Sequence, residues 1–145
     1  MLTLSAVQKA LDDAVALKGE DYVYPSPDCA YSTNPALGEQ APSCIVGYVL
    51  NALEPEVFKE VAKREWQKPD PSLGVYVDEY GYAVDSTTVE GLRDRWGIRA
   101  FDDAEDGVVE LLYEAQSNQD SGNTWGSSVA LAREYLERRA DGSEV

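Results

Sequence analysis

The chain has 145 residues, 27 of them acidic and 12 basic, which gives a formal net charge of −15 at pH 7. This charge repels phosphate backbones and anionic membranes, so we expect no direct nucleic-acid binding and no membrane association. Hydrophobic residues make up 43% of the chain, which excludes a disordered polymer and is enough for one core. The first residues lack the basic flank and apolar run of a signal peptide, so we expect a cytoplasmic protein.

The first third of the chain predicts two helices separated by extended chain. Apolar residues recur at three- and four-residue steps over 4–18, a helical pattern that Gly19 ends. Short extended pieces are expected at 22–24 and 29–31, before a loop rich in proline and glycine. A helix over 44–53, capped by Ser43, is apolar on nearly every side, so it should lie at the centre of the fold. Gly47 in its middle indicates the close approach of another segment.

The middle of the chain predicts a helix and a hairpin. Pro55 suits a first helical turn, and the apolar pattern extends that helix to about Gln67. The aromatic and β-branched residues from 73 to 84 are typical of a hairpin whose turn lies near 78–81.

Three further helices are expected in the last part of the chain. The first is short and capped by Ser86 or Thr87, and the second opens at Asp102 or Asp103. The third, capped by Thr124, should bury the ring of Trp125. The resulting prediction is an α+β fold, predominantly helical, with five or six helices and one or two small β-hairpins. A single globular domain should cover residues 1–140, followed by a flexible tail at 141–145.

The motifs that mark common enzymes are missing from the sequence. The chain has no histidine, which excludes imidazole triads and histidine-containing zinc sites. It contains neither a Walker A pattern nor Gly-x-Gly-x-x-Gly. The acidic run 102–107 fails as a calcium loop, because Ala104 and Tyr113 stand where oxygen ligands are required. We therefore predict no catalytic residue, no metal and no cofactor, and a protein that is a binding module rather than an enzyme.

An alternative interpretation is a small enzyme or a ligand-binding domain. Its pocket would lie around Tyr22, Cys29, Cys44 and Tyr48, which bring aromatic and thiol groups into the extended pieces and the apolar helix. Two cysteines are too few for a disulfide framework, so both are expected to be reduced and buried.

The acidic residues are unevenly distributed along the chain. Residues 72–106 hold nine acidic side chains against three arginines, a net charge of −6, whereas residues 41–71 carry a net charge of −1. A face of this kind predicts a basic protein surface as the partner. Tyrosines beside the acids would add contact area. The predicted partner-binding residues are Asp78, Glu79, Tyr80, Tyr82, Asp102 and Asp103.

Several stretches carry a resemblance to known sequences. They are 19–24 (GEDYVY), Cys29 with Tyr31, 42–47 (PSCIVG) with 49–50, and, near the other end, 115–116, 119–120, Gly122 and 125–126. In these stretches the sequence resembles a group of small uncharacterised proteins of actinobacteria and their phages, and the resemblance covers the two ends of the chain, about half of it. Members often carry histidines where this chain has Tyr48 and Asn51, so chemistry that depends on them is absent here. The resemblance implies no activity. It favours small accessory proteins, including those that inhibit host factors. Together with the acidic face, it leads to the hypothesis of a phage-encoded binding module that inhibits a host factor, with nucleic-acid mimicry as the specific form.

Overall fold

The computed structural model describes residues 1–25, 30–74, 77–85 and 87–140. Its described residues form six helices and one small antiparallel sheet of two strands, which confirms the predominantly helical α+β prediction. The α-helices are α1 (Leu4–Lys18), α2 (Ile45–Leu53), α3 (Pro55–Glu65), α4 (Val89–Asp94), α5 (Val108–Asp120) and α6 (Trp125–Ala140). The strands are β1 (Trp66–Gln67) and β2 (Ala83–Val84), and three 3-10 turns are η1 (Pro35–Leu37), η2 (Pro71–Leu73) and η3 (Arg99–Phe101).

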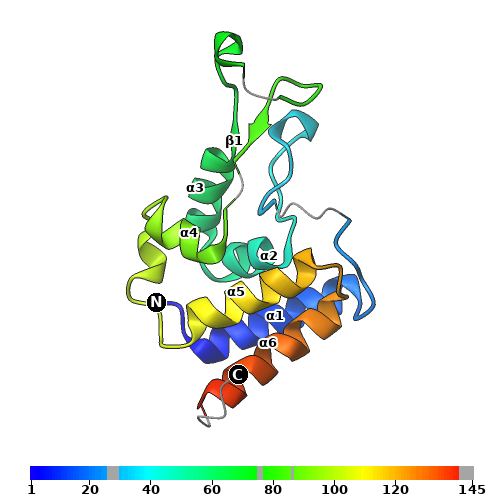
Figure 1. The fold of residues 1–145 in the computed structure, drawn as a ribbon, viewed down its shortest axis with the longest axis vertical. Helices are drawn as coiled ribbons and strands as arrows, with labels where there is room; N and C mark the ends of the chain where they lie inside the picture. The colour runs from blue at the N-terminus through cyan, green and yellow to red at the C-terminus, as the bar shows by residue number, and fades with distance from the viewer. Residues whose placement is uncertain (26–29, 75–76, 86, 141–145) are drawn as a thin grey trace.

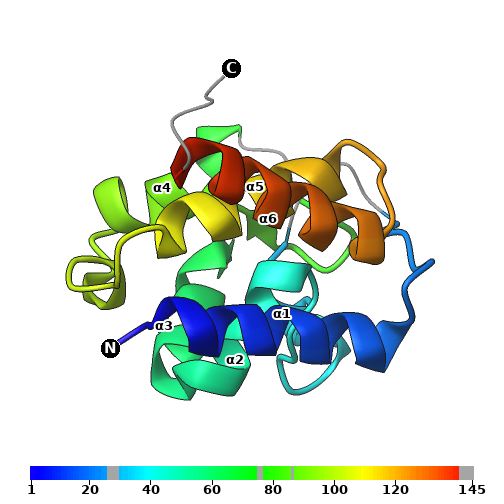
Figure 2. The same ribbon diagram turned by 90° about the horizontal axis from the view of Figure 1, so that it is seen from below.

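The helices gather around α2. In Figure 1, α1, α5 and α6 lie at the bottom, α2 lies above them, and α3 and α4 rise on the left. The turned view in Figure 2 shows α1 beneath α6 and α5, with α2 and α3 beside α1. Helix α2 contacts α1, α3 and α5, while α6 packs on α5 and α1. The apolar helix therefore lies at the centre of the fold, as its sequence predicts.

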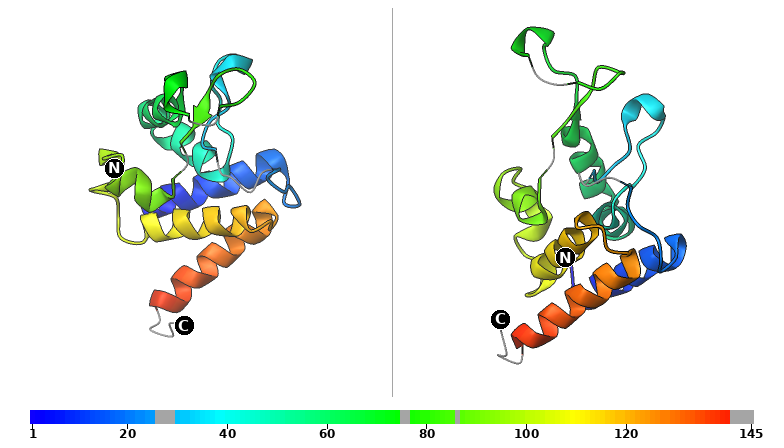
Figure 3. Two further views of the ribbon diagram at one scale, coloured as in Figure 1. Left: turned by 45° about the horizontal axis from the view of Figure 1, so that its top comes forward. Right: turned by 45° about the vertical axis from the view of Figure 1, so that its right-hand side comes forward.

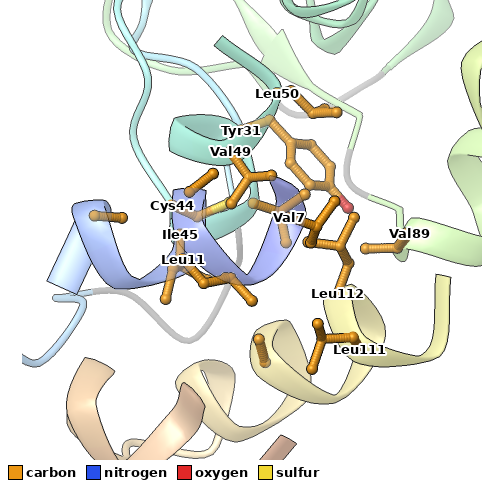
Figure 4. Packing of buried hydrophobic residues seen from close by; sticks show 14 of the residues in the cluster. Val7, Leu11, Tyr31, Cys44, Ile45, Val49, Leu50, Val89, Leu111 and Leu112 are labelled. Carbon is orange, nitrogen blue, oxygen red and sulfur yellow. The ribbon is translucent and has the colours of Figure 1, made fainter. Parts of the chain in front are cut away.

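The core is one cluster of buried side chains drawn from every α-helix. Figure 4 shows its centre, where Val7 and Leu11 of α1 face Ile45 and Val49 of α2. Apolar residues at three- and four-residue steps along each helix form the buried stripes, and the burial of such side chains is the main force that stabilises the fold.

Gly47 lies directly against the chain at Tyr31. A Cβ atom at Gly47 would stand 2.0 Å from the backbone oxygen of Tyr31, closer than any real contact allows. The predicted close approach is thus confirmed, and the approaching segment is the chain at residue 31. This contact brings the phenol of Tyr31 into the core, where its hydroxyl donates to the backbone oxygen of Thr87 at 2.7 Å.

The sheet differs from the predicted hairpin. Helix α3 ends at Glu65 rather than Gln67, because Trp66 adopts extended backbone dihedral angles. Trp66 and Gln67 pair with Val84 and Ala83, so the strand at 83–84 bonds to the chain that directly follows α3. The predicted turn is present, since the amide of Asp78 donates to the oxygen of Tyr82 at 2.8 Å. Val75 and Tyr76 lie outside the described residues.

Two predicted helix starts are too early, the cap of α4 by one or two residues and the start of α5 by several. Helix α4 is capped by Thr88, whose backbone is extended and whose hydroxyl accepts the amide of Gly91 at 3.1 Å. Ser86 lies outside the described residues. Helix α5 begins at Val108 after Gly107, so Asp102 and Asp103 lie in the turn that follows η3. The cap of α6 is confirmed: Thr124 accepts the amide of Ser127 at 3.1 Å.

The segment 22–24 is extended but forms no strand of its own. Val23 makes one antiparallel bridge with Thr124, and Ser32 makes another with Pro42. Among the helices in the described part of the chain, none is both long and apolar enough to cross a membrane.

Candidate functional site

Three segments project together from the helices and form what we call the loop end. It consists of residues 33–41, 66–74 and 77–85, as far as these are described. Figure 1 shows them at the top of the molecule, beyond α2 and α3, and Figure 3 shows from two further sides that they stand away from α1, α5 and α6. The loop end includes four predicted partner-binding residues, Asp78, Glu79, Tyr80 and Tyr82.

The turn at the centre of the loop end is held by Asp78. Its Oδ1 accepts the amides of Tyr80 and Tyr82, both at 2.9 Å, and its Oδ2 accepts the side-chain amide of Asn34. The Tyr82 amide, together with the other donors, holds the pKa of Asp78 below its usual value. Gly81 closes the turn with φ at 83°, a conformation that favours glycine. Tyr80 is therefore presented on an ordered turn.

Large apolar side chains are concentrated on the loop end. Nine large hydrophobic residues are exposed among the described residues, and five of them belong to these three segments. The five are Leu37, Leu73, Val77, Tyr80 and Val84. Singly exposed apolar residues are ordinary, whereas a concentration at one end of a molecule is typical of an interaction surface.

The same segments carry a negative charge. The acidic residues of the loop end are Glu39, Asp70, Asp78, Glu79 and Asp85, and its described basic residue is Lys68, a net charge of −4. Lys68 lies over the ring of Tyr82, 5.0 Å from its centre. The surface thus combines apolar side chains with carboxylates.

The segment 33–41 is closed at its base by two hydrogen bonds. The amide of Thr33 donates to the oxygen of Ala41, and the amide of Ala41 donates to Oγ1 of Thr33, both at 2.9 Å. Gln40 adds a bond from its side-chain amide to the oxygen of Ala62 in α3 at 3.2 Å. These bonds fix the base of the segment and leave η1 at its tip.

Glu65 lies beneath the loop end and is fully buried. Its Oε2 accepts the amide of Tyr31 at 2.7 Å. Its Oε1 accepts the amide of Ser32 at 2.9 Å and the hydroxyl of Ser32 at 2.7 Å. Burial raises the pKa of this carboxyl to about 7, against the opposing effect of the three donors.

Two residues of the alternative pocket, Tyr22 and Tyr48, pack against the same buried ring. The rings of Tyr22 and Tyr48 pack edge-on against Trp125, with ring centres 4.9 and 5.6 Å away, and Lys18 lies over both tyrosines. Trp125 is completely buried, as predicted. A surface depression of about 410 Å³ lies nearby, but its walls come from other residues: Asp12, Val15, Glu20, Asp21, Thr124, Gly126, Ser127, Val129, Ala130 and Arg133.

Of the two thiols, Cys44 is the one that lies in the described part of the chain. Cys44 is fully buried at the start of α2 and is a free thiol, in agreement with the prediction. Cys29 lies outside the described residues. Within the described part, no three or more cysteine, aspartate or glutamate side chains are placed to hold a metal ion.

Asp102 and Asp103 are not part of the loop end. Both are exposed, and the segment that carries them lies against the start of α1, where Glu105 accepts the amide of Leu4 at 3.2 Å. In Figure 1 this segment is at the left beside the N-terminus, whereas the turn of Asp78 is at the upper right. The predicted acidic face is thus divided between two regions.

Sequence reasoning missed the buried polar residues that organise the site. Glu65 follows Phe58, Val61 and Ala62 at helical spacing, so it falls on the buried stripe of α3. Gln116 and Gln119 occupy the same kind of position on α5. A polar residue in register with an apolar stripe was the signal that could have identified them.

Comparison of the chain with protein-family models, with curated proteins and with solved structures found no match in any of the three.

Proposed function

We propose that the protein is a non-enzymatic binding module that engages a basic protein surface through the loop end. The observation that carries this proposal is that exposed Leu37, Leu73 and Tyr80 lie on the same three segments as five carboxylates, and that Asp78 and Glu65 hold these segments. Apolar and aromatic side chains supply most of the energy of protein interfaces, and complementary charge accelerates association.

The ordered turn favours binding because less conformational freedom is lost when a partner docks. Tyr80 is 48% exposed, yet its backbone amide is already bonded to Asp78. Holding a contact residue in place before binding lowers the entropic cost of forming the interface. The apolar side chains favour a partner with hydrophobic sockets among its basic residues over a bare phosphate-binding groove. They therefore favour a protein partner with an apolar contact surface over the nucleic-acid-binding groove that mimicry requires.

The test compares two matched double variants in capture experiments from an actinobacterial lysate. Leu37→Ser with Tyr80→Ser removes two apolar contacts of the loop end, and Leu17→Ser with Leu131→Ser removes two comparably exposed residues from α1 and α6. We expect the wild-type protein and the α1/α6 variant to retain a basic protein that the loop-end variant loses. Equal capture by both variants, or no capture by the wild-type protein at low salt, would contradict the proposal.

A second pair of variants tests the charge. Glu39→Gln with Glu79→Gln removes two negative charges from the loop end, and Glu60→Gln with Glu137→Gln removes two from exposed sites elsewhere. The Debye screening length falls from about 10 Å at 0.1 M salt to about 3 Å at 1 M. Association with the captured partner should therefore slow at high salt. The loop-end pair should slow it at low salt, whereas the control pair should have a smaller effect. The same slowing by both pairs would show that net charge alone matters.

A further inference from the structure

Glu65 is a buried carboxylate surrounded by hydrogen-bond donors. None of the described residues that bond to it carries a positive charge. Two backbone amides and one hydroxyl, from Tyr31 and Ser32, donate to its oxygens at 2.7–2.9 Å. A buried ionised group normally requires a charged partner in addition to hydrogen bonds. Two effects therefore act on Glu65 in opposite directions. The hydrogen-bond donors stabilise the ionised carboxylate, and burial stabilises the protonated carboxyl.

Glu65 also joins the three segments of the loop end at their base. Its carboxylate holds Ser32, which precedes segment 33–41, and its own chain continues into β1. Its backbone oxygen accepts the amide of Asp85 at 2.8 Å, which fixes the end of segment 77–85. Trp66 adds a bond from its indole to the oxygen of Ser32 at 3.1 Å. Each segment thus depends on this position.

Among the described residues, no charged group of a neighbouring element neutralises Glu65. Asp85 is the charged residue whose field acts on it, and this field opposes ionisation. Asp85 itself pairs with Arg95 at 3.8 Å. Arg64 of α3 donates instead to the backbone oxygen of Trp96, and Lys68 lies over Tyr82. The Tyr31 hydroxyl donates away, to the oxygen of Thr87.

We infer that Glu65 is a positioning residue of the loop end and that it couples proton uptake to the docking of these segments. Docking removes the carboxyl from water without a cation, so the docked arrangement binds a proton more tightly than an arrangement in which Glu65 is exposed. Acidification below neutral pH then tightens the loop end, and alkaline pH loosens it. This regulation of the binding surface rests on the proposed function.

The size of the linkage follows from the two proton affinities. An exposed glutamate has a pKa of 4.5, whereas the docked carboxyl has a pKa of about 7. The equilibrium constant for docking should fall about tenfold from pH 6 to pH 8. Between a pH well below 4.5 and a pH well above 7 it should fall about 300-fold.

Amide hydrogen exchange of the free protein tests the inference without any partner. We expect the protection of the Tyr31 and Ser32 amides, corrected for the intrinsic exchange rate, to fall about tenfold from pH 6 to pH 8. Glu65→Gln should abolish this dependence, and Glu60→Gln, on the exposed side of the same helix, should leave it unchanged. A protection that is constant with pH, or that still varies in Glu65→Gln, would overturn the inference.

A second measurement uses the unaltered chain, in case Glu65→Gln does not fold. The side-chain carboxyl carbon of Glu65, followed by NMR, should titrate near pH 7 together with the Tyr31 and Ser32 amides. A midpoint near 4.5 would overturn the inference. Neither readout involves the partner, so failure here is distinguishable from failure of the capture experiments.

Discussion

The side-chain oxygen of Gln119 in α5 accepts the backbone amide of Ile45, the first residue of α2, at 2.9 Å. Cys44, the residue at the cap position of α2, makes no side-chain capping bond. The most buried helix is thus capped from another helix, and the bond joins residues 74 positions apart. Both partners are buried, so the bond is protected from water.

Replacing Gln119 by leucine should destabilise the fold by about 1–3 kcal/mol, because the Ile45 amide would remain buried without an acceptor. Chemical denaturation measures the change. Ser117→Ala, at an exposed position of the same helix, should change the free energy of unfolding by no more than about 0.5 kcal/mol. Similar values for the two variants would show that the cap contributes little.

Gly47→Ala should lower the free energy of unfolding by about 3 kcal/mol or more, the upper end of the range for overpacked cores. The loss is large because the added methyl group would clash with the backbone at Tyr31 and not with a movable side chain. The thermal midpoint reports the loss. Ala52→Gly, at an exposed position of α2, should cost only about 1 kcal/mol, the ordinary helix-propensity difference. A neutral Gly47→Ala would mean that the chain at residue 31 is free to move away.

Trp125→Ala should destabilise the protein by about 3–5 kcal/mol, since it removes a completely buried ring and its edge-on contacts with Tyr22 and Tyr48. The control is Leu131→Ala, at a partly exposed position of α6, for which a loss of under about 1 kcal/mol is expected. Urea unfolding curves of the two variants give the comparison. Equal losses would place the ring of Trp125 outside the core.

Stability should depend on pH through Glu65. The folded chain holds this proton up to about pH 7 and the unfolded chain loses it near 4.5, so the free energy of unfolding falls as pH rises between these values. The contribution is about 3 kcal/mol, and Glu65→Gln should remove the slope. Asp70, Asp78 and Asp94 have lowered pKa values, so their opposite contributions lie at more acidic pH. Unfolding curves at pH 5, 6, 7 and 8 measure the slope, and a rise in stability over this range would contradict the assignment.

Cys44 should react with a thiol reagent only when the protein opens, because its side chain is fully buried. In the native protein the variant Cys29→Ser, which leaves Cys44 as the remaining thiol, should be labelled at a rate that tracks unfolding. Denaturant should restore rapid labelling. Labelling of the native variant as fast as that of the unfolded chain would show that the start of α2 is accessible.

Most of the helical fold could be predicted because amphipathic periodicity depends on residues close in sequence. The central position of α2, the approach to Gly47 and the burial of Trp125 all follow from local patterns. The partner of the strand at 83–84 could not be predicted, because pairing with residues 66–67 depends on where α3 ends in space.

The candidate site was predictable only in part, for the same reason. Asp78 and Tyr80 are recognisable as turn residues, but their proximity to Asn34 spans 44 positions. Charge counted along the chain placed Asp102 and Asp103 with this turn, although the fold puts them beside α1. Glu65 was not identified, because composition treats every glutamate as a solvated charge.

The bonds between Thr33 and Ala41 make the segment that they enclose a natural point for inserting foreign sequence. They join the two ends of the segment at its base, on either side of η1. A change of sequence at the tip should therefore leave the packing of the helices unaltered. A peptide placed after Gly38 would be tethered at both ends without disturbing a buried side chain, since Leu37, Gly38 and Glu39 are all exposed. The helices could thus serve as a display framework on which the tip is varied to select new specificities.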